Sequence, residues 1–308
     1  MKSLGKYFKI IRQRPQIIPR ALRGLVRATL LRQPALRGVE LAVTYRCQAR
    51  CAKCSAVSFE RPGVPEMSLP QIRDAVRQIV STGAVLIDIT GGEPLLRADI
   101  VDIARIVGRM PVIGSLASNA LLLNNSLAQD LRGAGISVMQ FGISSPDAEE
   151  HDREIGRPGS FQKLLAAIEL AKSRGIEVLL NAVITREVLH SVRMRQLADL
   201  AIQFRCFLSL VLPAPVGRWR NAPVTLTSDD YAILRRWLRY PFITMDTESC
   251  YRGGCPAGSE KIYISAYGDV YPCPFIQHRV GNIFETGLRE LWNKTAAASY
   301  ARCVNIGP

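Results

Sequence analysis

Three cysteines stand close together before residue 60. Cys47, Cys51 and Cys54 are separated by three and then two residues, and they follow an extended apolar stretch at 39–46. Thiolates are the usual protein ligands of iron–sulfur clusters, and three of them leave one iron of a four-iron cluster open. A closed structural zinc site uses four protein ligands, but neither a histidine nor a fourth cysteine lies near this loop. The spacing therefore favours a cluster loop over a zinc site.

A second candidate site follows another apolar run, at 85–90. It reads Gly91-Gly92-Glu93-Pro94, in which two glycines permit a close backbone approach, Glu93 offers a carboxylate and Pro94 fixes the turn. Together with the Cys-x3-Cys-x2-Cys loop, this motif resembles the radical S-adenosylmethionine (SAM) superfamily. The resemblance covers residues 39 to about 303.

The resemblance implies a catalytic role for the cysteine loop. Cys47, Cys51 and Cys54 would hold a [4Fe–4S] cluster whose open iron binds the amino and carboxylate groups of SAM. Reductive cleavage of SAM would give methionine and a 5′-deoxyadenosyl radical, which abstracts a hydrogen atom from the substrate. Glu93 would engage the methionine amino group. The resemblance also implies an electron donor, such as a flavodoxin or a ferredoxin, as a partner.

Further SAM contacts are expected on later strands. Asn119 is a candidate because 118–120 reads Ser-Asn-Ala where relatives commonly show Thr-Asn-Gly. The family pattern Ser-Leu-Asp-Gly-Pro reads Gly-Ile-Ser-Ser-Pro here, at 142–146, and its later Arg-Gly reads Ile-Gly. Ser144, Arg153 or Arg157 are the candidates to replace the missing contacts. Asn181 is another candidate, the alternative being a buried amide that hydrogen-bonds to the backbone.

The C-terminal cysteines form a second pattern. Cys255 and Cys273, with Gly268 between them, resemble the SPASM/twitch extension of radical SAM enzymes, which holds auxiliary [4Fe–4S] clusters. Because only Cys303 follows, we expect a shortened version with one auxiliary cluster, and two [4Fe–4S] clusters in all. Cys303 and Cys250 would complete its four ligands. If Cys250 is free instead, the open iron could bind substrate, or the Cys250 thiol could donate a hydrogen atom.

Strand-like and helix-like segments alternate from residue 39 onward. Strands are expected at 39–44, 85–90, 112–117, 136–143, 177–184 and 204–212, and helices are expected to begin near Ser68, Ala98, Ser126, Ser160 and Leu189. This alternation predicts βαβ units and a parallel sheet, whose carboxyl edge would carry both motifs. Cys206, early in the sixth strand, is expected to be a small buried hydrophobe.

The predicted fold is α/β. It consists of a partial (βα)6 TIM-like barrel, as in the radical SAM superfamily, and a small C-terminal iron–sulfur domain with a β-hairpin and a helix. The Pro/Gly-rich segment 213–218 suggests a boundary, so the expected domains are a basic segment at 1–38, the barrel at 39–217 and the auxiliary domain at 218–308. A helix is expected at 227–239, a hairpin around Gly268 and a last helix at 288–294.

Positive charge is concentrated at the N-terminus. Residues 1–39 carry ten Lys or Arg and no acidic residue, which leaves +4 of the total +14 for the other 269 residues. This argues against a nucleic-acid groove on the barrel. Leu22, Leu25, Val26 and Leu30 fall at helical spacing, with prolines limiting the helix to about 20–33. The favoured interpretation is a helix packed across the barrel bottom, and the alternative is peripheral contact with an anionic membrane.

Composition limits the remaining functions. The chain has 308 residues, 48% of them apolar, with no apolar stretch near the ~18 residues of a membrane span and no secretory signal. Clustered cysteines suggest metal ligation in the cytoplasm. We therefore expect a radical SAM enzyme that acts on a small-molecule, lipid-like or peptide substrate. The alternatives are a ribosomal peptide maturase of the same superfamily and, from another class, a non-catalytic zinc or nucleic-acid-binding protein.

Overall fold

The computed structural model describes residues 14–245 and 255–298. Its centre is a ten-stranded sheet in the order β10-β9-β8-β1-β2-β3-β4-β5-β6-β7. The strands are β1 (Gly38–Thr44), β2 (Leu86–Gly91), β3 (Ile113–Ser118), β4 (Ile136–Gly142), β5 (Glu177–Val183), β6 (Phe207–Val211), β7 (Ile243–Met245), β8 (Lys261–Ile264), β9 (Asp269–Tyr271) and β10 (Gly281–Asn282). Strands β1 to β7 pair in parallel with their neighbours, and β8 pairs in parallel with β1. Strand β9 pairs antiparallel with both β8 and β10.

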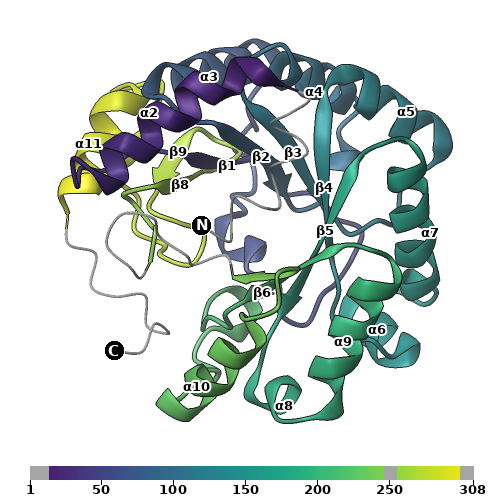
Figure 1. The fold of residues 1–308 in the computed structure, drawn as a ribbon. Coiled ribbons are helices and arrows are strands. Elements are labelled where there is room, and N and C mark those ends of the chain that lie inside the picture. Colours follow the sequence, from purple (N-terminus) through teal and green to yellow (C-terminus); the bar gives the residue numbers. More distant parts are fainter. Residues whose placement is uncertain (1–13, 246–254, 299–308) are drawn as a thin grey trace.

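Helices cover the outer face of the curved sheet (Figure 1). They are α2 (Ile18–Thr29), α3 (Leu69–Thr82), α4 (Ile100–Gly108), α5 (Asn125–Ala134), α6 (Ala148–Ile155), α7 (Ser160–Ser173), α8 (Arg186–Leu189), α9 (Val192–Gln203), α10 (Ser228–Trp237) and α11 (Leu288–Ala297). Short 3-10 turns are η1 (Pro15–Ile17), η2 (Ala56–Phe59), η3 (Pro94–Leu96) and η4 (Gly217–Trp219). The expected partial (βα)6 barrel is confirmed.

Side chains alternate along the barrel strands between the helix layer and the interior, as the pleat requires. In β5, Val178, Leu180 and Ala182 belong to the apolar core under the helices, whereas Leu179, Asn181 and Val183 line the interior. The outward positions are apolar because they pack on helices. The inward positions include polar residues, so the barrel interior is suited to binding a ligand with polar groups.

Most expected elements lie within a few residues of their predicted ends. Helix α3 has the predicted start and stop, with a capping box between Ser68 and Gln71 and Gly83 in the left-handed conformation at φ +104°. The helix expected from Leu189 is divided, because Ser191 caps a new helix, α9. The sixth strand begins at Phe207 and not at 204, because Arg205 has φ +50° in the turn that follows α9. Helix α6 and strand β7 were not expected.

The N-terminal helix begins earlier than predicted. Pro19 does not mark the start of α2 but lies in its first turn. A backbone N–H there has no partner within the helix, so proline removes no hydrogen bond. Just before it, Ile17 is fully buried and packs with Ile113, Val138 and Leu179. Arg14 donates to the carbonyl oxygens of residues 108, 112 and 135 at 2.9–3.3 Å. The start of the described chain therefore packs across the barrel bottom, as the favoured interpretation expected.

The C-terminal hairpin continues the barrel sheet at the β1 edge. Gly268 lies in the hairpin turn with φ +84°, as predicted. Beyond the hairpin, α11 lies beside α3, where the Gln78 side chain accepts from the backbone N–H of Leu288 at 2.8 Å. The boundary expected at residue 217 stays a prediction, since both parts share one sheet. In the part of the chain that the structure describes, no helix combines the length and apolarity that crossing a bilayer requires.

Candidate active site

The three loop cysteines follow the carboxyl end of β1. Cys47 is exposed, and Cys51 and Cys54 are half-buried. Burial, and after it the neighbouring Cys54 and Cys47, raise the pKa of Cys51 to about 11, because adjacent thiolates repel one another. Burial also raises the pKa of Cys47. Without a bound cation the raised pKa values keep Cys47 and Cys51 protonated, whereas iron would compensate the charges of three thiolates. This donor set fits a three-cysteine iron–sulfur cluster.

The cysteine loop rests on the C-terminal end of α6. The backbone N–H of Arg50 donates to Ile155 O at 3.0 Å, and that of Ala52 donates to Glu154 O at 2.9 Å. The Arg157 Nε donates to Gln48 O at 2.5 Å. Arg157, a candidate SAM contact, therefore binds the cysteine loop. Arg153 is exposed on α6.

A second support for the loop was missed by sequence reasoning. Cys54 O accepts from the backbone N–H of Arg218 at 3.0 Å, and Arg218 Nη1 donates to Arg50 O at 3.3 Å. A Cβ added to Gly217, which has φ +62°, would lie 2.0 Å from Cys54 O. The sequence signal was a glycine in a Pro/Gly-rich segment that we interpreted only as a boundary. Gly217 is required there because the backbone passes directly against the cysteine loop.

Gly91 and Gly92 bring the second motif against the same loop. The N–H of Gly92 donates to Thr44 O at 2.7 Å, and that of Glu93 donates to Arg46 O at 2.9 Å. A Cβ on Gly91 would lie 2.0 Å from Thr44 O, and one on Gly92 would lie 2.6 Å from two backbone carbonyl oxygens of 45–46. The two glycines therefore let the backbone of the second motif pass close to the segment that leads into Cys47.

Glu93, which follows β2, hydrogen-bonds to residues at the end of β3. Its side chain is fully buried and accepts from the Leu95 N–H at 3.0 Å, the Ser118 hydroxyl at 2.9 Å and the Asn119 N–H at 2.7 Å. Burial raises the pKa of Glu93, and these three donors oppose that effect. Pro94 is buried and begins η3. The contact expected between Glu93 and the methionine amino group stays a prediction.

Asn119 lies directly beside the cysteines. Its Nδ2 donates to Cys47 Sγ at 3.7 Å, while its Oδ1 accepts from Gln48 Nε2 at 3.2 Å and from the Leu121 N–H at 3.1 Å. The next residue, Ala120, is buried at φ +68°, where relatives commonly have glycine. The loop after β3 is therefore held in the conformation that glycine favours, and it orients Asn119 towards Cys47.

The loop after β4 is held by a buried histidine. His151 is 2% exposed, and burial lowers its pKa to about 4, so it is neutral. Its Nδ1 accepts from the Ser144 N–H at 3.2 Å. Asp152 caps α7 through the Ser160 hydroxyl at 2.8 Å and the Phe161 N–H at 2.8 Å. Ser144 is half-buried at this strand end, and its contact with SAM stays a prediction.

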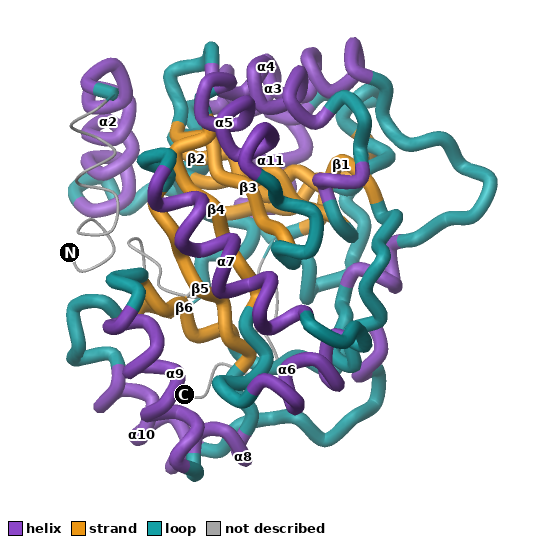
Figure 2. The backbone as a smooth tube through the Cα atoms, turned by 90° about the vertical axis from the view of Figure 1, so that its right-hand side faces the viewer, coloured by secondary structure: helices purple, strands orange, loops and turns teal. Residues whose placement is uncertain are grey.

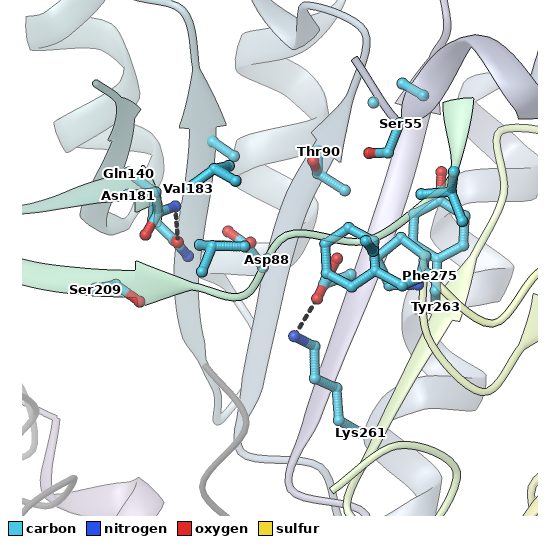
Figure 3. A pocket seen from close by; sticks show the side chains of 18 of the residues that line it. Ser55, Asp88, Thr90, Gln140, Asn181, Val183, Ser209, Lys261, Tyr263 and Phe275 are labelled. Atoms are coloured by element: carbon cyan, nitrogen blue, oxygen red, sulfur yellow. Dashed lines mark hydrogen bonds and ion pairs between the residues drawn. The ribbon is translucent and has the colours of Figure 1, made fainter. Parts of the chain in front are cut away.

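A cavity of about 350 Å³ fills the barrel interior beneath the cysteine loop. Lys53 and Ser55 of that loop and Gly91 of the second motif line it. Figure 3 shows Gln140 and Asn181 together on one wall and Lys261 on another. The cavity is therefore continuous with the place where both motifs meet.

The cavity wall carries hydrogen-bonding groups. Asn181 Nδ2 donates to Gln140 Oε1 at 2.9 Å, and Gln140 Nε2 donates to Ser115 Oγ at 2.9 Å. Asn181 is thus bonded to a side chain and not to the backbone. Lys261 of β8 forms an ion pair with Glu40 of β1 inside the cavity, and Asp88 also lines it. These groups suit a ligand with polar atoms.

The C-terminal cysteines lie on the hairpin side of the sheet. Cys255 is half-buried and Cys273 is buried. The N–H of Gly258 donates to Pro272 O at 3.1 Å, so the turn after Cys255 lies against the residue before Cys273. Cys250 and Cys303 lie outside the described residues. Cys206 is buried, as expected, and its thiol donates to Phe204 O at 3.5 Å.

An aromatic cluster joins the hairpin to the cysteine loop, and sequence reasoning did not find it. It comprises Tyr45, Phe59, Tyr263, Tyr267 and Tyr271. The hydroxyls of Tyr45 and Tyr263 are 2.7 Å apart, and the rings of Phe59 and Tyr263 have centroids 4.9 Å apart. The signal was the three tyrosines of the hairpin, whose partners lie more than 200 residues earlier in the chain.

Two family models match the chain. The model of the radical SAM superfamily matches residues 41–194, and that of an iron–sulfur cluster-binding domain, SPASM, matches residues 255–305. The first match begins just before the cysteine loop and includes β2 to β5. The second includes Cys255, Cys273 and Cys303.

Relatives and solved structures resemble the chain over most of its length. An AdoMet-dependent heme synthase of Oleidesulfovibrio alaskensis is 25% identical over 295 residues, which cover 85% of this chain and 76% of the relative. A PqqA peptide cyclase of Xanthomonas euvesicatoria is 25% identical over 284 residues, covering 86% and 76%. The structure of Streptococcus suis SuiB bound to precursor peptide SuiA matches with a TM-score of 0.70 at 16% identity. This match covers 84% of this chain, which spans 65% of that protein's length.

Proposed function

The chain belongs to the radical SAM superfamily, and from this premise we propose that its substrate presents a polar, hydrogen-bonding group to the cavity inside the barrel. Membership makes the chain an enzyme that uses SAM and a [4Fe–4S] cluster, and the SPASM segment implies auxiliary iron–sulfur binding. It also sets aside the zinc and nucleic-acid-binding alternative. When bound, the reduced cluster supplies the electron that cleaves SAM to the 5′-deoxyadenosyl radical, which abstracts a hydrogen atom from the substrate.

In this proposal the chain's own residues hold and orient the cofactors. Cys47, Cys51 and Cys54 bind the cluster, and Asn119 hydrogen-bonds to Cys47 from the end of β3. Glu93 fixes that strand end through the Asn119 N–H. The backbone contacts from α6 and η4 support the loop, which lowers the reorganisation that cluster binding requires.

One observation carries the proposal about the substrate: residues of both motifs line the same cavity as the Gln140–Asn181 pair. Its volume of about 350 Å³ lies at the low end of ligand pockets, which suits a small molecule or a peptide side chain. The wall presents amide and charged side chains to the cavity, and a hydrocarbon could form no hydrogen bond with them. The lining therefore favours a polar small molecule or a peptide over a lipid-like substrate.

The auxiliary site and the partners complete the proposal. Cys255 and Cys273 are the proposed ligands of one auxiliary cluster, with Cys250 and Cys303 as its further ligands. If Cys250 is free instead, its thiol is the candidate hydrogen-atom donor. A flavodoxin or a ferredoxin would supply electrons in the cytoplasm. Contact with the inner face of the membrane would be peripheral and would involve the N-terminal segment.

Formation of 5′-deoxyadenosine tests the cofactor assignment. Reduced protein with SAM should form it slowly, and the triple variant Cys47→Ala, Cys51→Ala and Cys54→Ala should not. The same variant should keep the iron of the auxiliary site, with Cys206→Ala as a control that changes neither property. Turnover by the triple variant would contradict the loop assignment, and a triple variant without iron would contradict the auxiliary ligands.

The substrate proposal is tested with fractionated cell extract. The aqueous fraction should stimulate 5′-deoxyadenosine formation, and the chloroform-soluble fraction should not. Replacing Gln140 and Asn181 together by Leu should abolish this stimulation, and the basal rate without extract measures separately whether Asn181 also contacts SAM. Val183→Ala changes the same wall without removing a polar group, so it serves as the control. Stimulation by the chloroform fraction alone would overturn the proposal.

A further inference from the structure

Helix α2 turns a row of apolar side chains away from the barrel. Ile18, Leu22, Val26 and Leu30 follow one another at four-residue spacing and are 40%, 55%, 43% and 74% exposed, and Leu31 is 56% exposed. Of the twelve large apolar side chains exposed in the described residues, these five lie within fourteen positions. In Figure 2, α2 lies at the periphery of the molecule. The chain therefore carries a concentrated apolar surface on one helix.

The opposite side of the helix is fixed to the protein. Ala28 is fully buried, Ala21 packs beside Ile17, and Arg20 donates to Val80 O of α3 at 2.6 Å. These contacts hold α2 in one orientation, so the apolar row is a fixed surface. The expectation that the helix packs across the barrel bottom is correct for this side. Of the four side chains expected to face the barrel, Leu22, Val26 and Leu30 are exposed and Leu25 is half-buried.

Basic residues lie next to the apolar row. At 100° per residue, Arg23 and Arg27 follow Leu30 around the helix, and Arg32 lies just beyond the helix end. None of the first 39 residues is acidic. A helix with one apolar face and an adjoining row of cations lies in the plane of a bilayer surface, where the apolar side chains enter the interface and the cations meet anionic headgroups.

We propose that the exposed row of α2 docks on an anionic membrane surface. The alternative occupant, a second copy of this chain, would bring two rows of arginines together with no acidic residue of 1–39 to pair with them. One row of side chains is also small beside the ~1,200 Å² that stable protein interfaces bury. Charge and area both favour lipid. The docking places the protein at the membrane and does not require a lipid substrate, because no residue of the row lines the cavity.

Vesicle sedimentation of the full-length, cluster-loaded protein tests the proposal. Protein should pellet with vesicles of phosphatidylcholine and phosphatidylglycerol, much less with phosphatidylcholine alone, and less at high salt. Replacing Leu22, Val26 and Leu30 together by Ser should lower the partition coefficient at least tenfold, since their burial drives insertion. Val192→Ser with Ile202→Ser removes two exposed apolar side chains on α9 and should change nothing.

A second pair of variants tests the charge. Arg23→Gln with Arg27→Gln should weaken binding to anionic vesicles by about fivefold for each charge removed. Arg235→Gln with Arg236→Gln makes the same change on exposed residues of α10 and should leave binding intact.

Three outcomes would overturn the proposal. The first is wild-type protein that does not pellet with anionic vesicles, and the second is a triple Ser variant that pellets like wild type. The third is a wild-type dimer in sedimentation velocity that dissociates in the triple Ser variant, which would assign the row to self-association. Circular dichroism and basal 5′-deoxyadenosine formation should be unchanged in every variant, because these side chains are exposed, or half-buried at Arg27, and none of them lines the cavity.

Discussion

Gly92 illustrates how single residues build the site. A side chain there would meet the carbonyl oxygens of Tyr45 and Arg46, both 2.6 Å from a Cβ, and neither backbone group can move without moving Cys47. The glycine therefore acts by letting β2 bond to the segment that enters the cysteine loop. The Gly-Gly-Glu-Pro motif therefore has a structural role within the chain in addition to its expected role in binding a ligand.

We expect Gly92→Ala to cost at least about 2–3 kcal/mol in unfolding free energy, because the overlap is with backbone. It should also lower the iron bound after reconstitution. Gly133→Ala is the matched control: it lies in α5 with no atom within 4 Å of the new Cβ. This second change should stabilise the protein by about 0.5–1 kcal/mol. Equal effects from the two variants would contradict the close approach.

The pH dependence of stability should depend on His151. Its pKa is about 4 in the folded protein because of burial, against 6.5 when unfolded. Above pH 6.5 the residue is neutral in both states and has no effect. As pH falls from 6.5 towards 4, the unfolded chain binds a proton that the folded chain does not, so stability is lost, by at most about 1.4 kcal/mol per pH unit.

Denaturant titrations of wild type and His151→Asn between pH 6.5 and 4.5 measure this effect. The variant should show the smaller slope, since it keeps an acceptor for the Ser144 N–H but cannot be protonated. Asp230, whose pKa is lowered to about 2 by Thr227, His190 and Arg186 against the effect of burial, loses its contribution only below its usual value of 3.8. Identical slopes in the two proteins would refute the role of His151.

Among single residues, the sequence predicted those that belong to a recognisable motif. The cysteine spacing identified the loop because iron–sulfur ligation needs thiolates within a short segment. The supports of that loop could not be predicted, because Gly217 lies more than 160 residues from Cys54, and its role depends on a distance between two backbones. Asn181 was selected as a candidate, but its partner Gln140 was not, since cavity position depends on the register of β4 and β5.

Among the elements, the hairpin β8–β9 depends on one buried carboxylate. Asp269 is 1% exposed, accepts from Arg279 Nε at 2.8 Å and Asn282 Nδ2 at 3.0 Å, and forms an ion pair with Arg61. Arg61 lies after the cysteine loop, and its guanidinium stacks on Tyr267 at 4.2 Å from the ring centre. Asp269 therefore connects the hairpin to the strand that follows it and to the segment after the cysteine loop.

Asp269→Asn should cost about 2–3 kcal/mol, because hydrogen bonds to a charged group are worth roughly 1.5–3 kcal/mol and Asn cannot accept all of them. Asp102→Asn is the control, since its pair with Arg105 is half exposed and should be worth less than ~1 kcal/mol. Limited proteolysis should cut the first variant, and not the second, within 255–298. Resistance equal to wild type would show that the aromatic cluster holds the hairpin without Asp269.

Elements with strong local signals were predicted well. Helix α3 has both its cap residues in the sequence, and the first five barrel strands are apolar runs. Strand β7 has three residues and forms by pairing with β6, so its local sequence carries little signal. Helix α6 is short and mostly charged, so it was missed for lack of an apolar period, although Asp147 caps its start and Gly156 ends it.

Across the whole molecule, the segment at 14–31 has two functions on its two sides. Towards the barrel, Ile17 packs against Leu179, which also lines the cavity, so this segment closes the cavity from below. Away from the barrel, α2 exposes its apolar row. Removing the whole segment would disturb both, so truncation cannot separate barrel closure from membrane docking. Substitutions at two adjacent isoleucines, one buried and one exposed, can separate the two roles.

Ile17→Ser and Ile18→Ser make the same chemical change at positions that are 0% and 40% exposed. Ile17→Ser should cost about 3 kcal/mol or more, because it removes a fully buried side chain and places a hydroxyl among apolar groups. Its thermal midpoint should fall and its iron-loaded fraction should drop. Ile18→Ser should stay within about 0.5 kcal/mol of wild type and should weaken binding to anionic vesicles. If Ile18→Ser destabilises the fold as much as Ile17→Ser, the row belongs to the core, and the docking surface on α2 must be abandoned.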